Sequence, residues 1–411
     1  MKRIVIAGGG AAGLMAAVSV KDKLMDNCDV TIVEKNPRPA RKVMITGKGR
    51  CNVTNNCDID TLISSVPKNP RFLYSAFSVF PPNSVISFFE NAGVRLKTER
   101  GNRVFPVSDK AVDIVDALVN EVKKRNVKII CDELESVTAM DESVKSVTLK
   151  NGKSIECDSL LIATGGASYP LTGSTGDGYV IAEKLGHTVT EIKPSLVPLE
   201  CHEGFCTRLS GLSLKNVVLS AFEKGKKKPV FKEMGEMLFT HFGISGPLVL
   251  SASSYMRYMG KKEYYVEIDL KPALTNEQLD SRILKDFSEN SNKDFSNSLD
   301  KLLPKSLIPI IVNLSGISSD TKVNQINREQ RNTLVNLLKH FTLNITRPRP
   351  VEEAIITSGG ISVKEINPAT MESKIINGLY FAGEIIDVDA LTGGFNLQIA
   401  FSTGYLAGQN M

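Results

Sequence analysis

Three features are absent from this 411-residue chain, and each absence excludes a class of protein. No run of about 18 consecutive apolar residues occurs, so we expect no transmembrane helix. The seven cysteines form no C-x-x-C pair and are odd in number, which favours a reducing cytoplasm over a disulfide framework. The apolar start of the chain stops at the glycines of a folded motif and so predicts no signal peptide. The net charge of +5 is small for this length and indicates no particular partner.

The N-terminal segment carries the pattern of a dinucleotide-binding unit. Residues 2–7 predict a buried strand that leads into Gly8-Gly9-Gly10-Ala11-Ala12-Gly13, after which small apolar residues predict a helix. We expect Gly8 to permit a tight turn, Gly10 to admit a pyrophosphate, and Gly13 to let the helix pack closely. The N–H groups at the helix start, Ala11 and Ala12, would face the phosphates.

A second predicted strand ends on Glu34, 21 residues beyond Gly13. A carboxylate at this position can accept hydrogen bonds from a ribose diol. It would repel a 2′-phosphate, which makes NADP the least favoured dinucleotide here. A glycine motif alone is weak, but strand, glycines, helix, strand and acid in this order predict dinucleotide binding. The motif does not separate FAD from NAD.

Later glycine segments favour FAD. Residues 159–166 predict a strand followed by Ala163-Thr164-Gly165-Gly166, and residues 378–384 predict another that ends at Gly383 and Glu384, with Asp387 beyond. A final apolar helix would begin near Gly394, Phe395 and Asn396. Its N–H groups could face the pyrimidine end of a flavin and stabilise negative charge on the reduced ring. Both ends of the chain would then form one FAD domain; the alternative is that these glycines only form turns.

Residues 45–55 (Ile-Thr-Gly-Lys-Gly-Arg-Cys-Asn-Val-Thr-Asn) closely resemble the GGGRCNxTN signature of a bacterial flavoprotein family. That family includes the BaiN-type reductases and aminoacetone oxidase. Other matching stretches are 238–247, 357–361, 371–374 and 380–404, so the resemblance covers essentially the whole chain. It implies a flavoprotein with two dinucleotide-binding domains, of the kind described as NAD(P)/FAD-dependent oxidoreductases. Lys48 departs from the signature, because a glycine is frequent there.

The resemblance also implies further cofactor contacts. The signature loop would surround the ribityl and ring portions of FAD, Leu134 would lie near the adenine, and Gly176 with Asp177 would support the cofactor. The alternative for Asp177 is that it caps the next helix. The additional expected FAD contacts are Lys35, Lys42, Gly47, Gly49, Arg50, Cys51, Asn52 and Thr54.

Other polar clusters have competing interpretations. His241 is a candidate catalytic residue that would face the flavin and handle a substrate proton; alternatively, its imidazole bonds a backbone carbonyl and helps the β-domain fold. Cys51 is interpreted as packing, since Cys57 is spaced as C-x5-C. Residues 201–206 supply three soft ligands, Cys, His and Cys, whereas a zinc site needs a fourth ligand and usually tighter paired spacing, so no metal is expected. Residues 224–228 hold four lysines without interleaved aromatic residues, which favours a solvated hairpin tip over a nucleic-acid site.

The fold class predicted is α/β: a Rossmann-like FAD-binding domain built from both termini, with an inserted β-rich domain and a small helical subdomain. At about 150 residues per domain, the length fits two or three domains. The predicted helical subdomain includes Leu299, Leu302 and Leu303, and strand character is expected to return after residue 341. The predicted boundaries are 1–193 and 357–411 for the FAD domain, 194–274 and 342–356 for the β-rich domain, and 275–341 for the helical subdomain.

The function predicted is a cytoplasmic FAD-dependent oxidoreductase that passes hydride from NAD(P)H through the flavin to a small organic acceptor. No second glycine fingerprint follows a strand, so NAD(P)H would bind transiently in a cleft. The alternative is an oxidase of a small amine, similar to aminoacetone oxidase, that produces hydrogen peroxide. A third possibility is a regulatory or nucleic-acid protein with structural FAD, against which the modest charge argues. A small-molecule substrate is therefore expected, with neither a nucleic acid nor a membrane as partner.

Overall fold

The computed structural model describes residues 1–411, which divide into two compact units. Unit 1 comprises Met1–Ser195 and Pro350–Met411, and unit 2 comprises Leu196–Arg349. The chain returns to unit 1 at Pro350, earlier than the predicted boundary at 356/357. The reason is that β18 (Ile356–Ser358) pairs antiparallel with β11 (Lys193–Ser195) inside unit 1.

Unit 1 is organised around a five-stranded parallel sheet in the order β19-β10-β1-β2-β6. Its first and fourth strands in the chain, β1 and β10, are short apolar runs with buried side chains, as expected for a parallel sheet covered on both faces. The predicted Rossmann-like α/β domain is thus confirmed. The sheet strands are β1 (Lys2–Ala7), β2 (Cys28–Glu34), β6 (Lys128–Cys131), β10 (Ser159–Ile162) and β19 (Leu379–Phe381).

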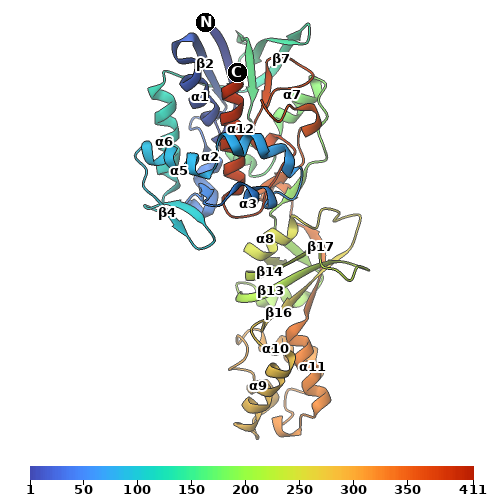
Figure 1. Cartoon of the computed structure of the whole chain (residues 1–411). Coiled ribbons are helices and arrows are strands. Elements are labelled where there is room, and N and C mark those ends of the chain that lie inside the picture. The colour runs from blue at the N-terminus through green and yellow to red at the C-terminus, as the bar shows by residue number, and fades with distance from the viewer. The chain divides into compact units, whose positions relative to one another are not determined.

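The two ends of the chain meet in unit 1, where α1 (Ala11–Leu24) and α12 (Phe395–Asn410) lie side by side (Figure 1). Glycines make this close packing possible. A Cβ at Gly404 would come within 2.2 Å of the Ala12 carbonyl oxygen, and one at Gly408 within 2.5 Å of the Ala16 oxygen. Because both contacts advance by four residues, the helices run parallel and their N-termini lie at the same end.

Smaller elements surround this framework. The signature loop leads into a three-stranded sheet in the order β3-β5-β4, and β7, β8 and β9 form an antiparallel meander. The remaining strands of unit 1 are β3 (Thr54–Asn55), β4 (Leu96–Glu99), β5 (Arg103–Pro106), β7 (Leu134–Met140), β8 (Ser143–Leu149) and β9 (Ser154–Glu156). The remaining helices are α2 (Arg41–Ile45), α3 (Ile59–Ser64), α4 (Tyr74–Val79), α5 (Pro82–Asn91), α6 (Ala111–Lys124) and α7 (Asp177–Lys184).

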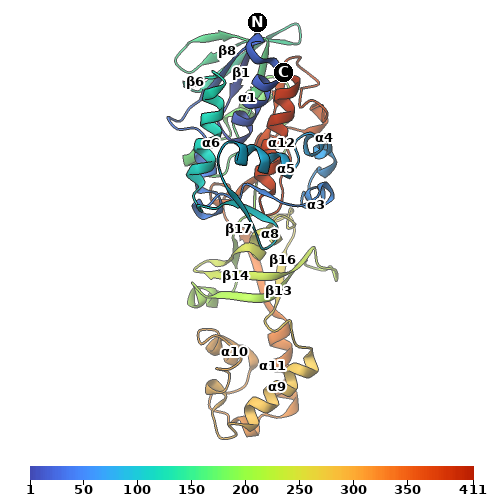
Figure 2. The same ribbon diagram turned by 60° about the vertical axis from the view of Figure 1, so that its left-hand side comes forward.

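Unit 2 contains a closed six-stranded barrel in the order β12-β15-β14-β13-β16-β17 (Figure 2). Alternate side chains of the long strands point inward, including Leu219, Phe239 and Val266, which are fully buried. The barrel strands are β12 (Leu199–Cys201), β13 (Ser213–Glu223), β14 (Phe231–Thr240), β15 (Gly243–Ser245), β16 (Tyr264–Asp269) and β17 (Phe341–Pro348), and α8 is Pro247–Ser253.

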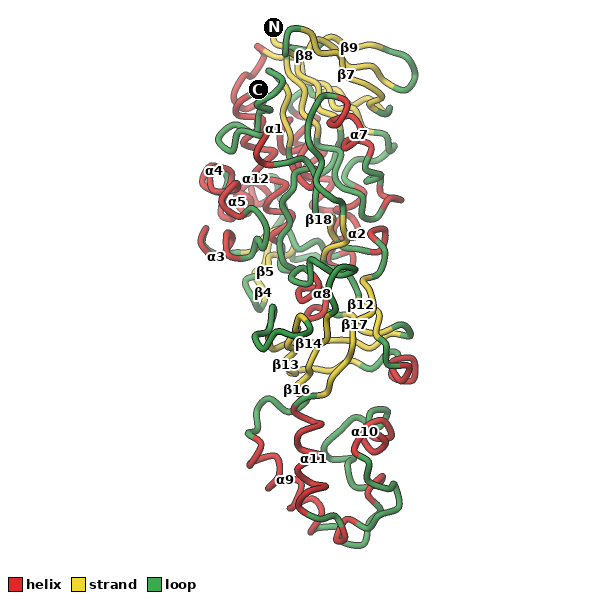
Figure 3. Tube along the Cα trace, turned by 90° about the vertical axis from the view of Figure 1, so that its right-hand side faces the viewer, coloured by secondary structure: helices red, strands yellow, loops and turns green.

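The segment between β16 and β17 is helical, as expected (Figure 3). It holds α9 (Asn276–Ser288), α10 (Ile308–Ser315) and α11 (Arg328–Lys339). Capping boxes begin α9, with Thr275 and Gln278, and α11, with Asn327 and Gln330.

Two local predictions in unit 2 are wrong. Leu299, Leu302 and Leu303 lie in turns rather than in a helix, because Pro304 disfavours a helical backbone at the residue before it. The returning strand ends at Pro348, and a 3-10 helix follows at Val351–Glu353. No helix of the chain is both long enough and apolar enough to cross a bilayer.

Candidate functional site

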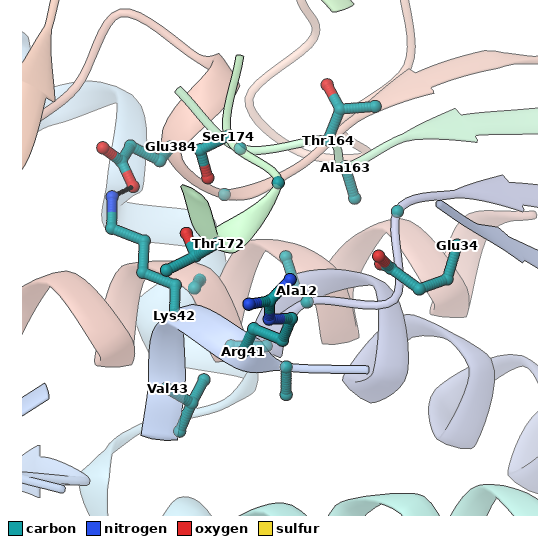
Figure 4. A pocket seen from close by; sticks show the side chains of 18 of the residues that line it. Ala12, Glu34, Arg41, Lys42, Val43, Ala163, Thr164, Thr172, Ser174 and Glu384 are labelled. Atoms are coloured by element: carbon teal, nitrogen blue, oxygen red, sulfur yellow. Dashed lines mark hydrogen bonds and ion pairs between the residues drawn. The ribbon is translucent and has the colours of Figure 1, made fainter. Parts of the chain in front are cut away.

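A pocket opens in unit 1 at the carboxyl edge of the parallel sheet (Figure 4). The chain lines it just beyond the end of each strand: at Gly8 after β1, Lys35 after β2, Asp132 after β6, Ala163 after β10 and Ala382 after β19. Ligands of open α/β sheets bind at this edge, because the loops that follow the strands converge there.

The glycine loop forms a cradle in the wall of this pocket. Gly8 has φ +101°, and a Cβ there would come within 2.4 Å of the Ala163 carbonyl oxygen. A Cβ at Gly13 would come within 2.0 Å of the Gly8 oxygen, so α1 packs directly on the loop. Gly10, in contrast, has nothing within 4 Å of its Cβ position. The three glycines therefore have the geometry expected for a tight turn, an open approach to the backbone and close helix packing.

The N-terminus of α1 at this cradle carries no side-chain cap and no acidic residue in its first turn. Its N–H groups without intrahelical partners and its positive dipole end fit an anionic group such as a diphosphate. The same holds for α12, whose N-cap Gly394 has φ +97° and no capping side chain. Two parallel helices thus present uncapped N-termini at one end of unit 1.

Glu34 lines the pocket at the end of β2 and is held rigidly, with 8% of its surface exposed. Its Oε2 accepts a hydrogen bond from the Gly9 N–H at 2.8 Å. Its Oε1 accepts from both the N–H and the side-chain amide of Asn36, each at 2.8 Å. These three bonds fix the carboxylate against the glycine loop and leave acceptor capacity on its oxygens for a ligand hydroxyl.

Asp177 does not cap α7, so that alternative interpretation is wrong. The N-cap is Gly176, with φ +81° and no side-chain cap, and Asp177 is the first helical residue. Its carboxylate instead pairs with Lys35 Nζ at 3.0 Å, and Lys35 also donates to Thr175 Oγ1 at 2.7 Å. This ion pair joins the end of β2 to the start of α7 at the pocket.

A second ion pair crosses the pocket wall between Lys42 and Glu384 (Figure 4). Lys42 Nζ lies 2.6 Å from Glu384 Oε2 and 2.6 Å from Ser168 Oγ, and that hydroxyl donates to Glu384 Oε1 at 3.0 Å. The Thr357 N–H donates to Glu384 Oε1 at 2.8 Å. The Lys42 side chain is 20% exposed and the Glu384 side chain 12% exposed. The network therefore holds this ion pair in a largely enclosed part of the pocket wall.

Asn396 lines the pocket from the first turn of α12. Its side chain accepts from the Ala390 N–H at 2.9 Å and donates to the Ala390 carbonyl at 2.8 Å, which locks the loop before the helix. A Cβ at Gly394 would come within 2.4 Å of the Thr54 carbonyl oxygen. The signature loop and the start of α12 are therefore packed directly together.

The signature loop has an unusual backbone. Gly47, Lys48, Gly49 and Cys51 have φ values of +57°, +58°, +81° and +59°. A left-handed conformation costs a residue with a Cβ about 1–2 kcal/mol, which explains why a glycine suits the position that Lys48 occupies. Burial raises the pKa of the Cys51 thiol to about 12, so it is protonated at neutral pH, as expected of a packing residue.

All the predicted cofactor residues of the signature loop lie outside the pocket lining, which includes only Thr46 from this loop. Arg50 instead pairs with Glu99 and Asp109, each at 2.5 Å, and stacks on Phe105 with its guanidinium 4.2 Å from the ring centroid. The predicted cofactor residues that do not line the pocket are Gly13, Gly47, Gly49, Arg50, Cys51, Asn52, Thr54, Gly166, Gly176, Asp387, Gly394 and Phe395.

Asp387 has a structural partner. It is 3% exposed, accepts from Lys68 Nζ, and accepts from the Asn69 side chain through its backbone oxygen at 2.8 Å. It therefore anchors the loop at residues 68–69.

The predicted residues that the pocket brings together are Gly8, Gly10, Ala11, Ala12, Glu34, Lys35, Lys42, Leu134, Ala163, Thr164, Gly165, Asp177, Gly383, Glu384 and Asn396. The sequence analysis missed many other residues that line the pocket. Many of them are immediate neighbours of the predicted residues, and their positions just beyond predicted strands could have identified them. They are Ala7, Val33, Asn36, Ala40, Arg41, Val43, Thr46, Asp132, Glu133, Thr172, Gly173, Ser174, Ile355, Ile356, Ala382, Val388, Leu397, Ile399 and Ala400.

His241 belongs to unit 2 and does not line this pocket. It is exposed at the turn between β14 and β15, with its ring against Phe242 at a centroid distance of 5.0 Å. The predicted bond from its imidazole to a backbone carbonyl is not formed; only its own carbonyl accepts a bond, from Thr207. No group of three or more His, Cys, Asp or Glu side chains is arranged to hold a metal ion.

The comparisons with known proteins identify a family. A family model described as the HI0933-like protein Rossmann domain matches residues 2–410. A 3-dehydro-bile acid delta(4,6)-reductase of Clostridium scindens is 31% identical, over 100% of this chain and 98% of its own. A ribosomal RNA dihydrouridine synthase of Haemophilus influenzae is 33% identical, over 98% of this chain and 96% of its own.

The fold has a counterpart among solved structures. The crystal structure of 3-ketosteroid delta1-dehydrogenase from Sterolibacterium denitrificans, in complex with 1,4-androstadiene-3,17-dione, superposes with a TM-score of 0.54. The sequences are 13% identical and the match covers 99% of both chains, so the likeness is one of fold. With the family match over residues 2–410 and the dinucleotide cradle at Gly8–Gly13, the chain belongs to the HI0933-like family, as an FAD-dependent oxidoreductase of the BaiN type.

Proposed function

We propose that the protein reduces a carbon–carbon double bond conjugated to a carbonyl group, with NAD(P)H as the electron donor. The observation that carries the proposal is that two relatives spanning the whole chain bear names for one chemistry on different molecules. A 3-dehydro-bile acid with delta(4,6) unsaturation has double bonds in conjugation with its ring ketone. Dihydrouridine is uridine with its ring double bond, which is conjugated to a carbonyl, saturated.

FAD supplies the hydride chemistry when bound, and the chain orients the cofactor and provides its electrostatic environment. We assign the diphosphate to the open backbone at Gly10 and the N-terminus of α1, and the ribose to Glu34. The uncapped N-terminus of α12 would stabilise negative charge on the reduced ring. Apolar lining residues, among them Val388 and Leu397, would exclude water.

The Lys42–Glu384 pair has a positioning role in this proposal. Both side chains line the pocket and are held by Ser168 and Thr357, so neither is free to rotate away. A fixed ion pair of this kind gives hydroxyl groups of a dinucleotide one defined set of donors and acceptors.

The donor is expected to bind transiently. The five-stranded parallel sheet carries the chain's one glycine fingerprint, at Gly8–Gly13, and that site is assigned to FAD. Nicotinamide would then approach the ring without a Rossmann domain of its own.

The test is an anaerobic absorption spectrum of the purified protein before and after NADH and then NADPH. Rapid bleaching of the flavin bands, followed by their return on addition of a cyclic enone, is the expected result. Bands that persist with both donors but bleach with a small amine, with peroxide formed in air, would overturn the proposal in favour of an amine oxidase. A colourless protein that FAD does not reconstitute would contradict the cofactor assignment.

A further inference from the structure

The charge of the chain is divided unequally between its units. Unit 2 has 22 Lys and Arg against 16 Asp and Glu, a net charge of +6. Unit 1 has 28 against 29, a net charge of −1. The modest overall charge of +5 therefore conceals a basic unit 2.

The structure gathers part of this charge at the tip of the β13–β14 hairpin and the adjoining loop. The tip of the β13–β14 hairpin meets the loop before β16, where the Lys224 N–H donates to the Glu263 carbonyl at 2.9 Å. Lys262 Nζ from that loop reaches Glu223 Oε1 at 2.9 Å. Together the two segments form a lysine cluster of Lys224, Lys226, Lys227, Lys228, Lys261 and Lys262.

Few acids neutralise the lysine cluster. Glu223 pairs with Lys226 and Lys262, and Glu263 pairs with Lys224. Lys227, Lys228 and Lys261 are exposed and form no ion pair. Three ammonium groups are thus left to face solvent on one small surface.

An exposed aromatic ring lies within the cluster. Tyr258 is 54% exposed, and Lys262 Nζ lies 4.9 Å from its ring centroid. The expectation of a merely solvated hairpin tip rested partly on the lack of an aromatic residue among residues 224–228. The fold brings that residue from a segment about 30 positions further along the chain.

We propose that the lysine cluster and Tyr258 form a binding surface for single-stranded RNA. Unpaired ammonium groups neutralise backbone phosphates, and an exposed ring beside them stacks on a base of any sequence. The inference deepens the proposed function by naming a substrate class, since the uracil ring of RNA carries a double bond conjugated to a carbonyl. An acidic peptide would use the charge but would leave Tyr258 without a stacking partner.

The test measures fluorescence anisotropy of a labelled oligouridylate of about 20 nucleotides with the FAD-loaded protein, between about 50 and 200 mM KCl. Binding that weakens steeply with salt is expected. Lys227→Glu/Lys228→Glu should weaken it at least about tenfold and flatten the salt dependence. Tyr258→Ala should weaken RNA binding about fivefold or more, because it removes the stacking ring. Tyr258→Phe keeps the ring and should bind RNA about as tightly as the parent protein.

The matched control is Lys145→Glu/Lys153→Glu, which makes the same charge change at exposed, unpaired lysines of unit 1. Equal loss of binding in this control would overturn the proposal, as would no binding at the lowest salt. Retention on anionic vesicles but not on RNA would assign the surface to a membrane instead. Flavin bleaching by NAD(P)H should be unchanged in all variants, so failure here is distinguishable from failure of the proposed function.

Discussion

Gly404 of α12 faces the carbonyl oxygen of Ala12 in α1, so closely that a Cβ on residue 404 would lie 2.2 Å from that oxygen. This contact joins the last helix of the chain to the first, directly beside the glycine cradle. It is the point at which residues almost 400 positions apart become one domain.

Gly404→Ala is therefore expected to lower the free energy of unfolding by about 1–3 kcal/mol, because one of two packed helices must shift. Thermal unfolding followed by circular dichroism measures the effect. Gly204→Ala is the matched control, since nothing lies within 4 Å of its Cβ position. Equal melting temperatures for both variants would contradict the argument.

Glu34→Gln should fold but retain much less FAD. The amide cannot accept at both terminal atoms, so it loses either the bond from Gly9 or those from Asn36, and it loses the charge that a ribose diol would meet. The ratio of flavin absorbance to protein absorbance after purification measures occupancy. Glu90→Gln, at an exposed site, should leave occupancy unchanged; full occupancy in Glu34→Gln would refute the ribose assignment.

Cys51 should be unreactive toward a thiol reagent in the folded protein at pH 8. Its side chain is fully buried and its pKa is raised to about 12, so almost no thiolate forms. Cys131 is exposed and should account for a fast phase that Cys131→Ser removes. Modification of Cys51 in the native state, detected by mass spectrometry, would show that the signature loop opens.

His187 should make stability depend on pH. It is 3% exposed, its Nε2 lies 2.8 Å from Ser373 Oγ, and burial lowers its pKa below the ordinary 6.5. Below pH 6.5 the unfolded chain therefore binds a proton that the folded protein does not, and stability falls as the pH drops toward the lowered pKa. Above pH 6.5 this contribution is fully present.

Melting temperatures measured from pH 8 to pH 5 test the point. His187→Gln should show a smaller loss below pH 6.5 than the parent protein. His241→Gln, at an exposed histidine of unit 2, serves as the control. Identical dependence of melting temperature on pH in the parent protein and in His187→Gln would show that His187 does not cause the loss of stability.

Local chemistry made much of unit 1 predictable from the sequence. The turn at Gly8, the open backbone at Gly10 and the acid at Glu34 depend on residues within one βαβ unit, where spacing along the chain fixes position in space. The hydrophobic runs of β1 and β10 likewise identify buried parallel strands. The error at Leu303 came from the following proline. The capping alternative for Asp177 was wrong because its carboxylate pairs with Lys35 instead.

The sequence by itself determined the dinucleotide cradle and the α/β class, because glycines and apolar periods act over short distances. It indicated the union of both termini through the later glycine segments at residues 159–166 and 378–384. Only the tertiary structure decided which charged groups meet. Lys42 and Glu384 are 342 positions apart. The segment that holds Tyr258 and Lys262 meets the 224–228 hairpin tip only through the pairing of β13 with β16. Composition and spacing along the chain do not predict such pairings, because the pairings depend on which surfaces the packed core brings together.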